Sequence, residues 1–334
     1  MNRQVYEVGV CERSAWTELW SQMPDRTVFH SLPWLETIEE AMGLRLVLAK
    51  VEKNGRCAGI WPSLEQRKGP LRVLGSPLPG WSTPYMGPLI AEGEEAQGVA
   101  EAVLSSDLIG KPSYFELRAL DRRTHLDLTP FGFERLRRFE TALLTLESDE
   151  QAMWDRLAGN CRTKVRKATK ANVEVREDYS LDFLEDFWQM SLETFGKSGR
   201  LPGYDLEFVR ILWGRLRPHA MVRAYSAWLG QQRIAVAIRL YDDRTVYAWN
   251  GVSTLEGRKL APNNLIEWHV IRDAITEGLS EHDFVSISGS AGTFKKSFGH
   301  EAVGIATHWS RSYSMFAAML KVVYEKYLRL RRRN

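Results

Sequence analysis

Cysteine is scarce in this chain, and its distribution excludes several kinds of site. The 334 residues include three cysteines, Cys11, Cys57 and Cys161, which lie far apart. None forms a C-x-x-C pair or lies at zinc-ligand spacing from a histidine. We therefore expect a reducing, cytoplasmic location and no structural metal.

Long hydrophobic runs and a large net charge are also missing. The stretch M-N-R-Q-V-Y-E-V at the start has no apolar segment typical of a signal peptide, and no window approaches the roughly 18 apolar residues of a membrane-spanning helix. The formal net charge is +3, so positive charge matters only where it is clustered. We expect neither standard export, nor a membrane span, nor a general nucleic-acid binder.

The order of predicted elements occurs twice. Two domains are expected, because 334 residues with 44% hydrophobic content exceed the roughly 250 to 300 residues at which one core stops growing. Each half has helices, three strands, a helix, a strand, a connection and a last strand. In the first half the helices lie within 15–42 and 94–108, and the strands at 44–51, 56–64, 71–74, 114–120 and 138–146. In the second half the helices lie at 180–195, 205–216 and 263–277, and the strands at 221–229, 233–241, 245–252, 283–287 and 303–309. We interpret this repeat as an internal duplication.

A basic helix opens the second half. Ser148, followed three residues later by Gln151, makes a capping box that predicts where this helix starts. The expected parts are therefore a first domain at 1–147, a second at 148–314 and a terminal helix at 315–334. One face of the basic helix is an apolar stripe of Trp154, Leu157, Ala158, Cys161, Val165 and Ala168. The remaining arc carries Arg156, Arg162, Arg166, Lys167 and Lys170, either as a site for a polyanion or as a solvated helix face.

Six local patterns occur in order along the chain. They are Phe29-His30-Ser31-Leu32-Pro33-Trp34; Pro79-Gly80 through Tyr85-Met86-Gly87-Pro88; Asn160-x-Arg162-x-Lys164-x-Arg166-Lys167-Ala168; Leu260-Ala261-Pro262-Asn263-Asn264-Leu265-Ile266-x-Trp268; His282-Asp283-Phe284; and Gly292-Thr293-Phe294-Lys295-Lys296-Ser297-Phe298-Gly299. Together with the repeated element order, they resemble the Fem family of peptidyltransferases and the CelD-like acyltransferases of the acyl-CoA N-acyltransferase (GNAT) superfamily. The resemblance implies an α/β (α+β) fold of tandem GNAT-like domains, each with a mixed, mainly antiparallel sheet flanked by helices.

The resemblance also implies an activity. It is a bacterial transfer of an acyl or aminoacyl group, from an activated ester or thioester donor, onto an amine of a cell-envelope precursor, either peptidoglycan or polysaccharide. In the Fem branch the donor is an aminoacyl-tRNA. We expect no permanently bound cofactor, with acyl-CoA or aminoacyl-tRNA as co-substrate. The alternative is a duplicated domain without catalysis that binds or scaffolds in envelope polysaccharide assembly.

The candidate donor site combines the basic helix with a later loop. The stretch Thr254-Leu255-Glu256-Gly257-Arg258-Lys259 lacks the small residues that build a pyrophosphate cradle from backbone N–H groups, which disfavours acetyl-CoA without excluding it. A phosphate could still be held there. The proposed donor-binding residues are Arg162, Arg166, Lys167, Arg258, Lys259 and Asn263.

The expected chemistry needs positive charge where an oxyanion develops, and no covalent nucleophile is indicated because G-x-S-x-G is absent. Lys295 matches the lysine of the family's Phe-Lys motif on a loop after the fifth strand, although an ordinary loop lysine is the alternative. Tyr247 and Asn250 are expected to line the transfer cleft, with a plausible bulge at Asn250-Gly251. The same strand carries Trp249, for which a core position is favoured.

Three residues of the first domain are expected to contact the acceptor, namely His30, Trp34 and Tyr85, and packing is the alternative for His30 and Trp34. The terminal segment 315–334 has an amphipathic helical pattern and a basic end. Such a helix either docks on its own domain, which is favoured, or makes a peripheral contact with the inner face of the cytoplasmic membrane.

Overall fold

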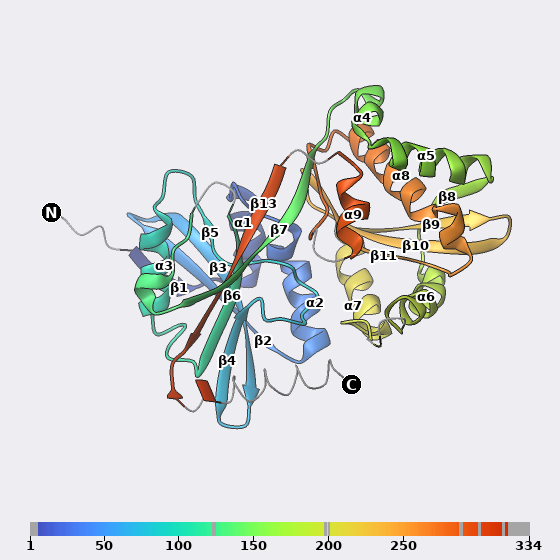
Figure 1. The fold of residues 1–334 in the computed structure, drawn as a ribbon. Coiled ribbons are helices and arrows are strands. Elements are labelled where there is room, and N and C mark those ends of the chain that lie inside the picture. The colour runs from blue at the N-terminus through green and yellow to red at the C-terminus, as the bar shows by residue number, and fades with distance from the viewer. Residues whose placement is uncertain are drawn as a thin grey trace. The chain divides into compact units, whose positions relative to one another are not determined.

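The computed structural model describes residues 6–121, 125–196, 199, 201–286, 290–299, 302–315 and 318–319. The chain divides into two compact units: unit 1 comprises Met1–Phe139 with Ile305–Asn334, and unit 2 comprises Glu140–Gly304. Each unit contains one part of the sheet and its own helices (Figure 1). The expected mixed, mainly antiparallel sheets flanked by helices are confirmed, whereas the strand expected at 283–287 is β12 at Glu281–Asp283.

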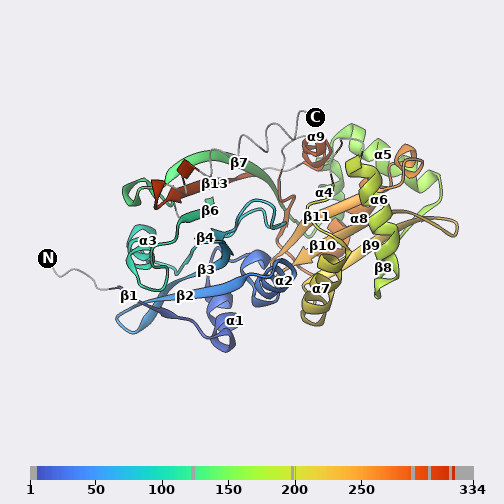
Figure 2. The same ribbon diagram turned by 90° about the horizontal axis from the view of Figure 1, so that it is seen from below.

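Unit 1 contains a sheet in the order β1-β2-β3-β4-β6-β13, with β5 beside β3. Its pairs are antiparallel except β4 with β6. The strands are β1 (Tyr6–Val10), β2 (Arg45–Lys53), β3 (Arg56–Lys68), β4 (Leu71–Ser76), β5 (Leu89–Ile90), β6 (Tyr114–Asp121) and β13 (Ala302–Ser312). The helices are α1 (Arg13–Gln22), η1 (Val28–His30), α2 (Leu32–Met42), α3 (Ala96–Ser105) and η2 (Thr129–Phe131). Helices α1 and α3 lie on opposite faces of this sheet (Figure 2).

The turn between β2 and β3 follows directly from two residues. Asn54 and Gly55 have φ angles of 52° and 74°, the left-handed conformation that both central residues of a tight hairpin require. Asparagine and glycine adopt this conformation at low cost, so the predicted hairpin is confirmed.

Unit 2 contains a sheet in the order β8-β9-β10-β11-β12-β7, antiparallel except for β11 with β12. The strands are β7 (Glu134–Thr145), which starts in unit 1, β8 (Val173–Asp178), β9 (Val222–Leu229), β10 (Gln232–Tyr241), β11 (Thr245–Ser253) and β12 (Glu281–Asp283). The helices are α4 (Glu150–Arg156), α5 (Gly159–Lys170), η3 (Leu181–Phe183), α6 (Leu184–Gly196), α7 (Leu206–Leu216), η4 (Arg217–His219), η5 (Gly257–Leu260), α8 (Pro262–Thr276) and α9 (Ser290–Lys296). Helices α5 and α8 cover one face and α6 with α7 the other (Figure 1).

The last strand of each half of the sequence is exchanged. The end of β7 pairs with β12 in unit 2, in the register Leu143↔Asp283 to Thr145↔Glu281. Strand β13 pairs with β6 in unit 1, from Ile305↔Asp121 to Ser312↔Tyr114. The sequence predicts the opposite assignment, with residues 303–309 closing the second domain and the boundary near 147–150. The prediction assumes that strands consecutive in sequence pair with each other, which is the usual case. Among the described residues, β6 pairs with β13 and not with β7, and β12 pairs with β7 and not with β13.

The basic helix is two helices rather than one. Leu157 and Ala158 have extended backbones, with ψ angles of 137° and 145°, and the Ala158 N–H donates to the Ser297 carbonyl oxygen at 2.9 Å. Trp154 therefore lies on α4 and not on the stripe of α5. The predicted cap is also wrong: Asp149, not Ser148, accepts hydrogen bonds from the first turn, from Gln151 N at 2.8 Å.

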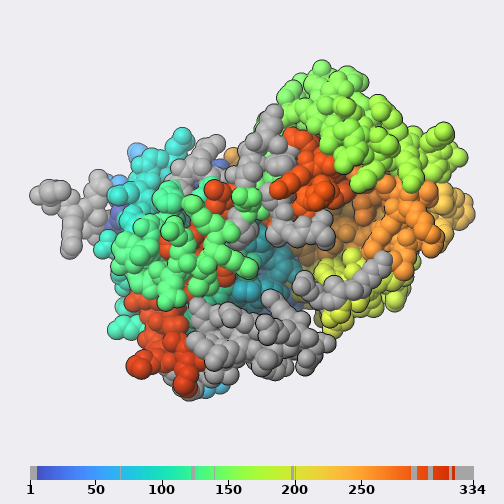
Figure 3. All heavy atoms as spheres, in the orientation of Figure 1, coloured from blue at the N-terminus to red at the C-terminus, as the bar shows by residue number. Residues whose placement is uncertain are grey.

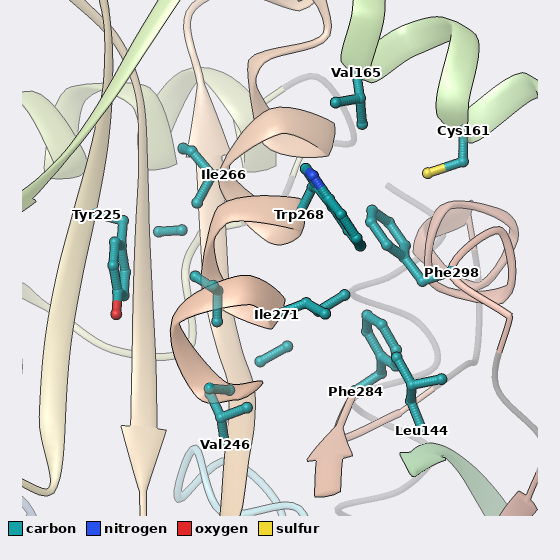
Figure 4. Close-up of a cluster of buried hydrophobic side chains, with 14 of the residues drawn as sticks. Leu144, Cys161, Val165, Tyr225, Val246, Ile266, Trp268, Ile271, Phe284 and Phe298 are labelled. Carbon is teal, nitrogen blue, oxygen red and sulfur yellow. The ribbon is translucent and has the colours of Figure 1, made fainter. Parts of the chain in front are cut away.

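The core of unit 2 lies between α8, α5, α9 and the sheet. Cys161, Val165 and Ala168 of α5 are buried, which confirms the predicted stripe over this helix. Trp268 of α8 and Phe298 after α9 lie in the same cluster (Figure 4). Burial of such side chains stabilises the fold by roughly 1.5 to 3 kcal/mol each.

Among the residues that the structure describes, no helix is both long and apolar enough to cross a membrane.

Candidate active site

Strands β11 and β12 of unit 2 separate after a short parallel ladder. They pair only from Thr245↔Glu281 to Tyr247↔Asp283. Strand β11 continues to Ser253, and among the described residues no strand pairs with this later part on the β12 side. The main-chain groups along that edge can therefore meet a bound ligand.

A buried charged cluster lies between the separating strands and α8. Arg239 of β10 donates from Nη2 to Glu267 Oε2 of α8 at 2.6 Å, and His282 Nε2 of β12 lies 2.7 Å from Glu267 Oε1. All three side chains are nearly inaccessible to solvent. Burial raises the pKa of Glu267, but the Arg239 charge and the His282 hydrogen bond outweigh it and lower the pKa to about 2. Glu267 is therefore a carboxylate at neutral pH.

Lys295 reaches the same cluster, but from a helix. The expected loop after the fifth strand contains α9, and Lys295 lies in its last turn. Its Nζ donates to the carbonyl oxygens of Phe284 at 2.6 Å and Ser286 at 2.7 Å. Burial lowers the pKa of Lys295 to about 8, against the attraction of Glu267. Lys296, the next residue, is exposed.

The backbone held by Lys295 is strained. Val285, between Phe284 and Ser286, has a φ of 68°, which is unusual for a β-branched residue. Its N–H donates to Asp283 Oδ1 at 2.6 Å, and Asp283 also accepts from the Thr141 hydroxyl. Such strain persists only where the surroundings enforce it, and it is frequent at functional sites.

The structure separates the other two proposed catalytic side chains from Lys295. Tyr247 donates its hydroxyl to Asp242 Oδ2 at 2.6 Å, and the Asn250 side-chain amide donates to the hydroxyl of Tyr204 on the α7 side of the sheet. The backbone irregularity lies opposite Arg239, between the pairs Ile238↔Asn250 and Leu240↔Tyr247, and not at Asn250-Gly251. Their catalytic roles stay predictions.

This β-bulge explains why two consecutive residues reach the same side chain. Trp249 packs on Tyr204 at 5.3 Å between ring centroids, and the Asn250 side chain bonds the same tyrosine. In a regular strand, consecutive side chains point to opposite faces. The regular alternation of side chains along this part of β11 is therefore interrupted. The bulge also leaves the Asn250 carbonyl oxygen 2.6 Å from Arg239 Nη1.

Helix α5 lies at the surface of unit 2 (Figure 3). It carries three of the proposed donor-binding residues, of which Arg162 is half-buried and Arg166 and Lys167 are exposed. Arg162 is held by the Asp155 carbonyl oxygen at 2.8 Å, and Arg166 lies over the Trp154 ring at 5.3 Å. Within the described part of the chain, Arg166 and Lys167 have no acidic partner. Their positive charges are therefore available to a phosphate.

A groove of about 400 Å³ between α4, α5 and α8 adjoins Arg166. Its lining combines an apolar floor with a basic rim. The lining residues are Trp154, Val165, Arg166, Thr169, Lys170, Leu265, Trp268 and Arg272.

The proposed donor residues outside α5 lie around the start of α8. Arg258 of η5 donates to the Thr194 hydroxyl at 2.7 Å, and Lys259 pairs with Glu256 at 2.8 Å. Asn263 is in the first turn of α8, and Asn264 links that turn to Cys161 of α5 at 3.5 Å. The two parts of the proposed donor site are thus adjacent.

The proposed acceptor residues come together in the interior of unit 1. Phe29 contacts the rings of both Trp34 and Tyr85, with centroids 5.2 and 5.3 Å apart. His30 and Trp34 are buried, with Trp34 Nε1 donating to Thr83 Oγ1 at 3.1 Å. This burial supports the packing alternative, and an acceptor role stays a prediction.

Sequence reasoning missed Arg239 and Glu267. A signal for Glu267 exists, because it shares the buried face of α8 with Asn264, Ile271 and Ala274 at helical spacing. A charged residue at such a position needs a partner. Arg239 lies in the run Arg233–Tyr241, which is predicted to be a strand. No local pattern in that run indicates that Arg239 pairs with Glu267. Among the described residues, no group of three or more His, Cys, Asp or Glu is placed to hold a metal.

Comparisons with known proteins agree with this fold. Residues 156–296 match the family model of the acetyltransferase (GNAT) domain. A crystal structure of FemX is similar over 95% of this chain and 99% of that chain, with a TM-score of 0.73 and 12% identity. A tandem GNAT protein from the clavulanic acid biosynthesis pathway is similar over 93% and 99%, with a TM-score of 0.55 and 12% identity.

A third solved structure extends the comparison. It is the C-terminal domain of a putative lysylphosphatidylglycerol synthetase from Agrobacterium fabrum, similar over 93% of this chain and 96% of that chain, with a TM-score of 0.54 and 10% identity. At these identities the likeness shows the fold. No curated protein sequence matches the chain.

Proposed function

From a chain that contains a GNAT domain and has the GNAT acyltransferase fold, we propose an acyltransferase that moves an acyl or aminoacyl group onto an amine of a cell-envelope precursor, peptidoglycan or polysaccharide. The observation that carries the proposal is the place where β11 and β12 separate beside the buried cluster of Arg239, Glu267, His282 and Lys295. The part of β11 beyond its ladder with β12 offers main-chain groups to an extended donor, and the cluster supplies charge.

In the proposed reaction, the acceptor amine attacks the donor carbonyl carbon and forms the C–N bond. The tetrahedral oxyanion then collapses, the thiolate or alkoxide leaves, and the amine proton is released. Lys295 has three N–H donors when protonated, and two of them bind main-chain carbonyls. The third is directed to the oxyanion or the leaving group.

The donor is an acyl-CoA or an aminoacyl-tRNA, held by α5 and the start of α8. Arg166 and Lys167 supply charge without acidic partners among the described residues, and Arg258, Lys259 and Asn263 lie at the adjoining turn. A polyanion bound there releases counterions, so its affinity falls as salt rises.

Titration of the full chain at two salt concentrations tests this donor site. Fluorescence binding of acetyl-CoA and of aminoacyl-tRNA is compared between the parent and the double variant Arg162→Ala/Arg166→Ala. The expected result is weaker binding and a salt dependence reduced by about one unit of slope per lost phosphate contact. The matched control is Arg176→Ala/Arg210→Ala, which removes the same charge elsewhere on unit 2. Binding that does not depend on salt and has the same affinity in the parent and in the α5 double variant would contradict the site.

The non-catalytic alternative also has an observation in its favour, because the Lys295 amino group already binds two main-chain carbonyls. Binding of an envelope precursor without turnover of any donor would support it.

We place the protein in the cytoplasm, with the terminal segment docked on its own unit. Most of residues 315–334 lie outside the described residues. Liposome co-sedimentation of the full chain and of a chain ending at Ser314 tests the location of this segment. Equal sedimentation with a lower melting temperature after truncation is expected, and a loss of sedimentation would instead show a membrane contact.

A further inference from the structure

A chain of buried polar groups links β11 beyond its ladder with β12 to His282, which lies within that ladder opposite Val246. It begins at the Asn250 carbonyl oxygen of β11, which accepts from Arg239 Nη1 at 2.6 Å. Arg239 Nη2 donates to Glu267 at 2.6 Å, and Glu267 contacts His282 Nε2 of β12 at 2.7 Å. The Arg239, Glu267 and His282 side chains are 5%, 1% and 0% exposed.

This polar chain starts beyond the ladder that the described residues of β11 and β12 form. Strands β11 and β12 pair no further than Tyr247 and Asp283, and Asn250 lies beyond that point. Through Glu267 of α8, the link therefore ties Asn250 to the paired part of β12. On the other side, Lys295 binds the carbonyl oxygens of Phe284 and Ser286, directly after β12. Each flank of the separation thus has a main-chain carbonyl held by a buried cation.

Stability alone is a poor explanation for this arrangement. Removing two charges from water costs several kcal/mol per ion, and well-packed apolar side chains of similar volume are often neutral or stabilising replacements. What apolar side chains cannot do is bind a carbonyl oxygen in one fixed geometry. The charged groups therefore fit a positional role.

A proton path is not supported by the contacts. The chain ends at His282, whose Nδ1 has no hydrogen-bond partner among the described residues. Glu267 is also held as a carboxylate by both of its neighbours. Transfer through the cluster would need an exit that this geometry lacks.

We propose that Arg239, Glu267 and His282 are positioning residues that hold the part of β11 beyond its ladder with β12, from the bulge to Ser253, at a fixed separation from β12 and Lys295. One consequence rests on the proposed function, namely that this separation sets where the donor carbonyl lies. The positioning of β11 itself does not depend on a bound ligand.

Hydrogen–deuterium exchange of the full chain tests the structural part. Glu267→Gln leaves Arg239 without a counter-charge and is the direct variant. Because that change threatens folding, Arg239→Met/Glu267→Leu is the second variant, which removes both charges at similar volume. In either variant, amides 248–253 are expected to exchange about tenfold faster or more, while β9 and unit 1 stay near parent rates.

Asp178→Asn is the matched control. Asp178 of β8 is buried and pairs with Arg233 at 3.2 Å. Arg233 lies on β10, as Arg239 does, but away from Asn250. This variant is expected to leave amides 248–253 unchanged. Parent-like exchange of these amides in the Arg239 and Glu267 variants, or an equal rise in every strand, would overturn the proposal.

Titration with acetyl-CoA and with aminoacyl-tRNA then separates the two proposals. If the parent binds neither probe, the proposed function fails while the exchange result still decides the positioning role. If the parent binds one, the Arg239 and Glu267 variants are expected to weaken it about tenfold more than Asp178→Asn does. Equal affinities in all variants would overturn the link between the polar chain and the donor.

Discussion

Lys295 combines two properties that rarely meet in an ordinary surface lysine. Its amino group is buried against Glu267, Arg239 and Asp283, and two main-chain carbonyls fix its position. Lys296 follows immediately and is exposed. This neighbouring pair offers a test of local chemistry within one helix.

We predict that Lys295→Ala lowers turnover by on the order of 10²-fold or more, about 2.7 kcal/mol, because one contact to the developing charge is lost. Ground-state binding of the substrates should change far less. Lys296→Ala should remain within a few-fold of the parent. Single-turnover rates with a circular dichroism check measure both, and equal losses for the two lysines would show that this helix supplies no specific charge.

The lowered pKa of Lys295 gives a pH dependence that needs no substrate. Burial lowers the pKa to about 8, whereas the unfolded chain keeps its ordinary value of 10.5. Between these values the unfolded chain binds more protons, so the free energy of unfolding gains a contribution that rises with pH. Urea unfolding of the parent and of Lys295→Met at pH 7 and pH 9.5 should show this rise in the parent alone. The same slope in both proteins would contradict a buried, shifted lysine.

At this scale, sequence patterns identify some groups and miss others. The motif around Lys295 identifies it as a candidate. Arg239 becomes a candidate only through its hydrogen bonds to Asn250 and Glu267, which lie 11 and 28 positions away in sequence. Such pairings depend on how α8 crosses the sheet, and local periodicity carries no information about that crossing. His30 and Trp34 belong to an apolar-aromatic motif that predicts acceptor contacts, and their burial supports packing without testing that role.

Among the elements, the start of α4, the first helix of unit 2, shows how local signals compete. Ser148 and Asp149 are both good N-cap residues, and the sequence pattern of a capping box favours the first. In the structure Asp149 accepts from Gln151 N at 2.8 Å and Ala152 N at 3.3 Å.

We predict that Asp149→Ala lowers the free energy of unfolding by about 1 kcal/mol, because two N–H groups of α4 lose their acceptor. Ser148→Ala is the control and should change it by less than about 0.5 kcal/mol. Denaturant unfolding measures both. A larger loss for Ser148→Ala would place the helix start one residue earlier.

Most helices and strands follow from periodicity, because their buried faces are regular. The break between α4 and α5 does not, since Leu157 and Ala158 continue the helical stripe in sequence. The Ser297 carbonyl that receives the Ala158 N–H lies far along the chain. Tertiary contact here overrides local preference.

For the whole molecule, the exchange of β7 and β13 is the feature that sequence order could not reveal. Unit 1 buries Trp309 of β13 with Phe115 of β6, and His308 contacts the Glu116 carboxylate. The last described strand therefore completes the first unit.

We predict that a chain ending at Phe298 loses protection in unit 1, although every residue before 298 is present. Strand β6 loses β13 and keeps only β4 as a partner. The buried Glu116 also loses His308, which typically costs 3 to 5 kcal/mol. A chain ending at Ser314 retains β13 and should keep parent protection over β6. Hydrogen–deuterium exchange of Tyr114–Asp121 reads the difference, and parent-like protection in the shorter chain would contradict the exchange.

The exchanged strand has a consequence for synthesis. A ribosome that has made β6 must still make more than half of the chain before β13 emerges, which takes roughly ten to forty seconds at about 5 to 20 residues per second. During that interval the edge of β6 that β13 later covers has no partner, and such an edge can pair with other chains. The amino-terminal unit is therefore the first to be synthesised and the last to be completed, and its dependence on chaperones should be greatest while the second unit is being made.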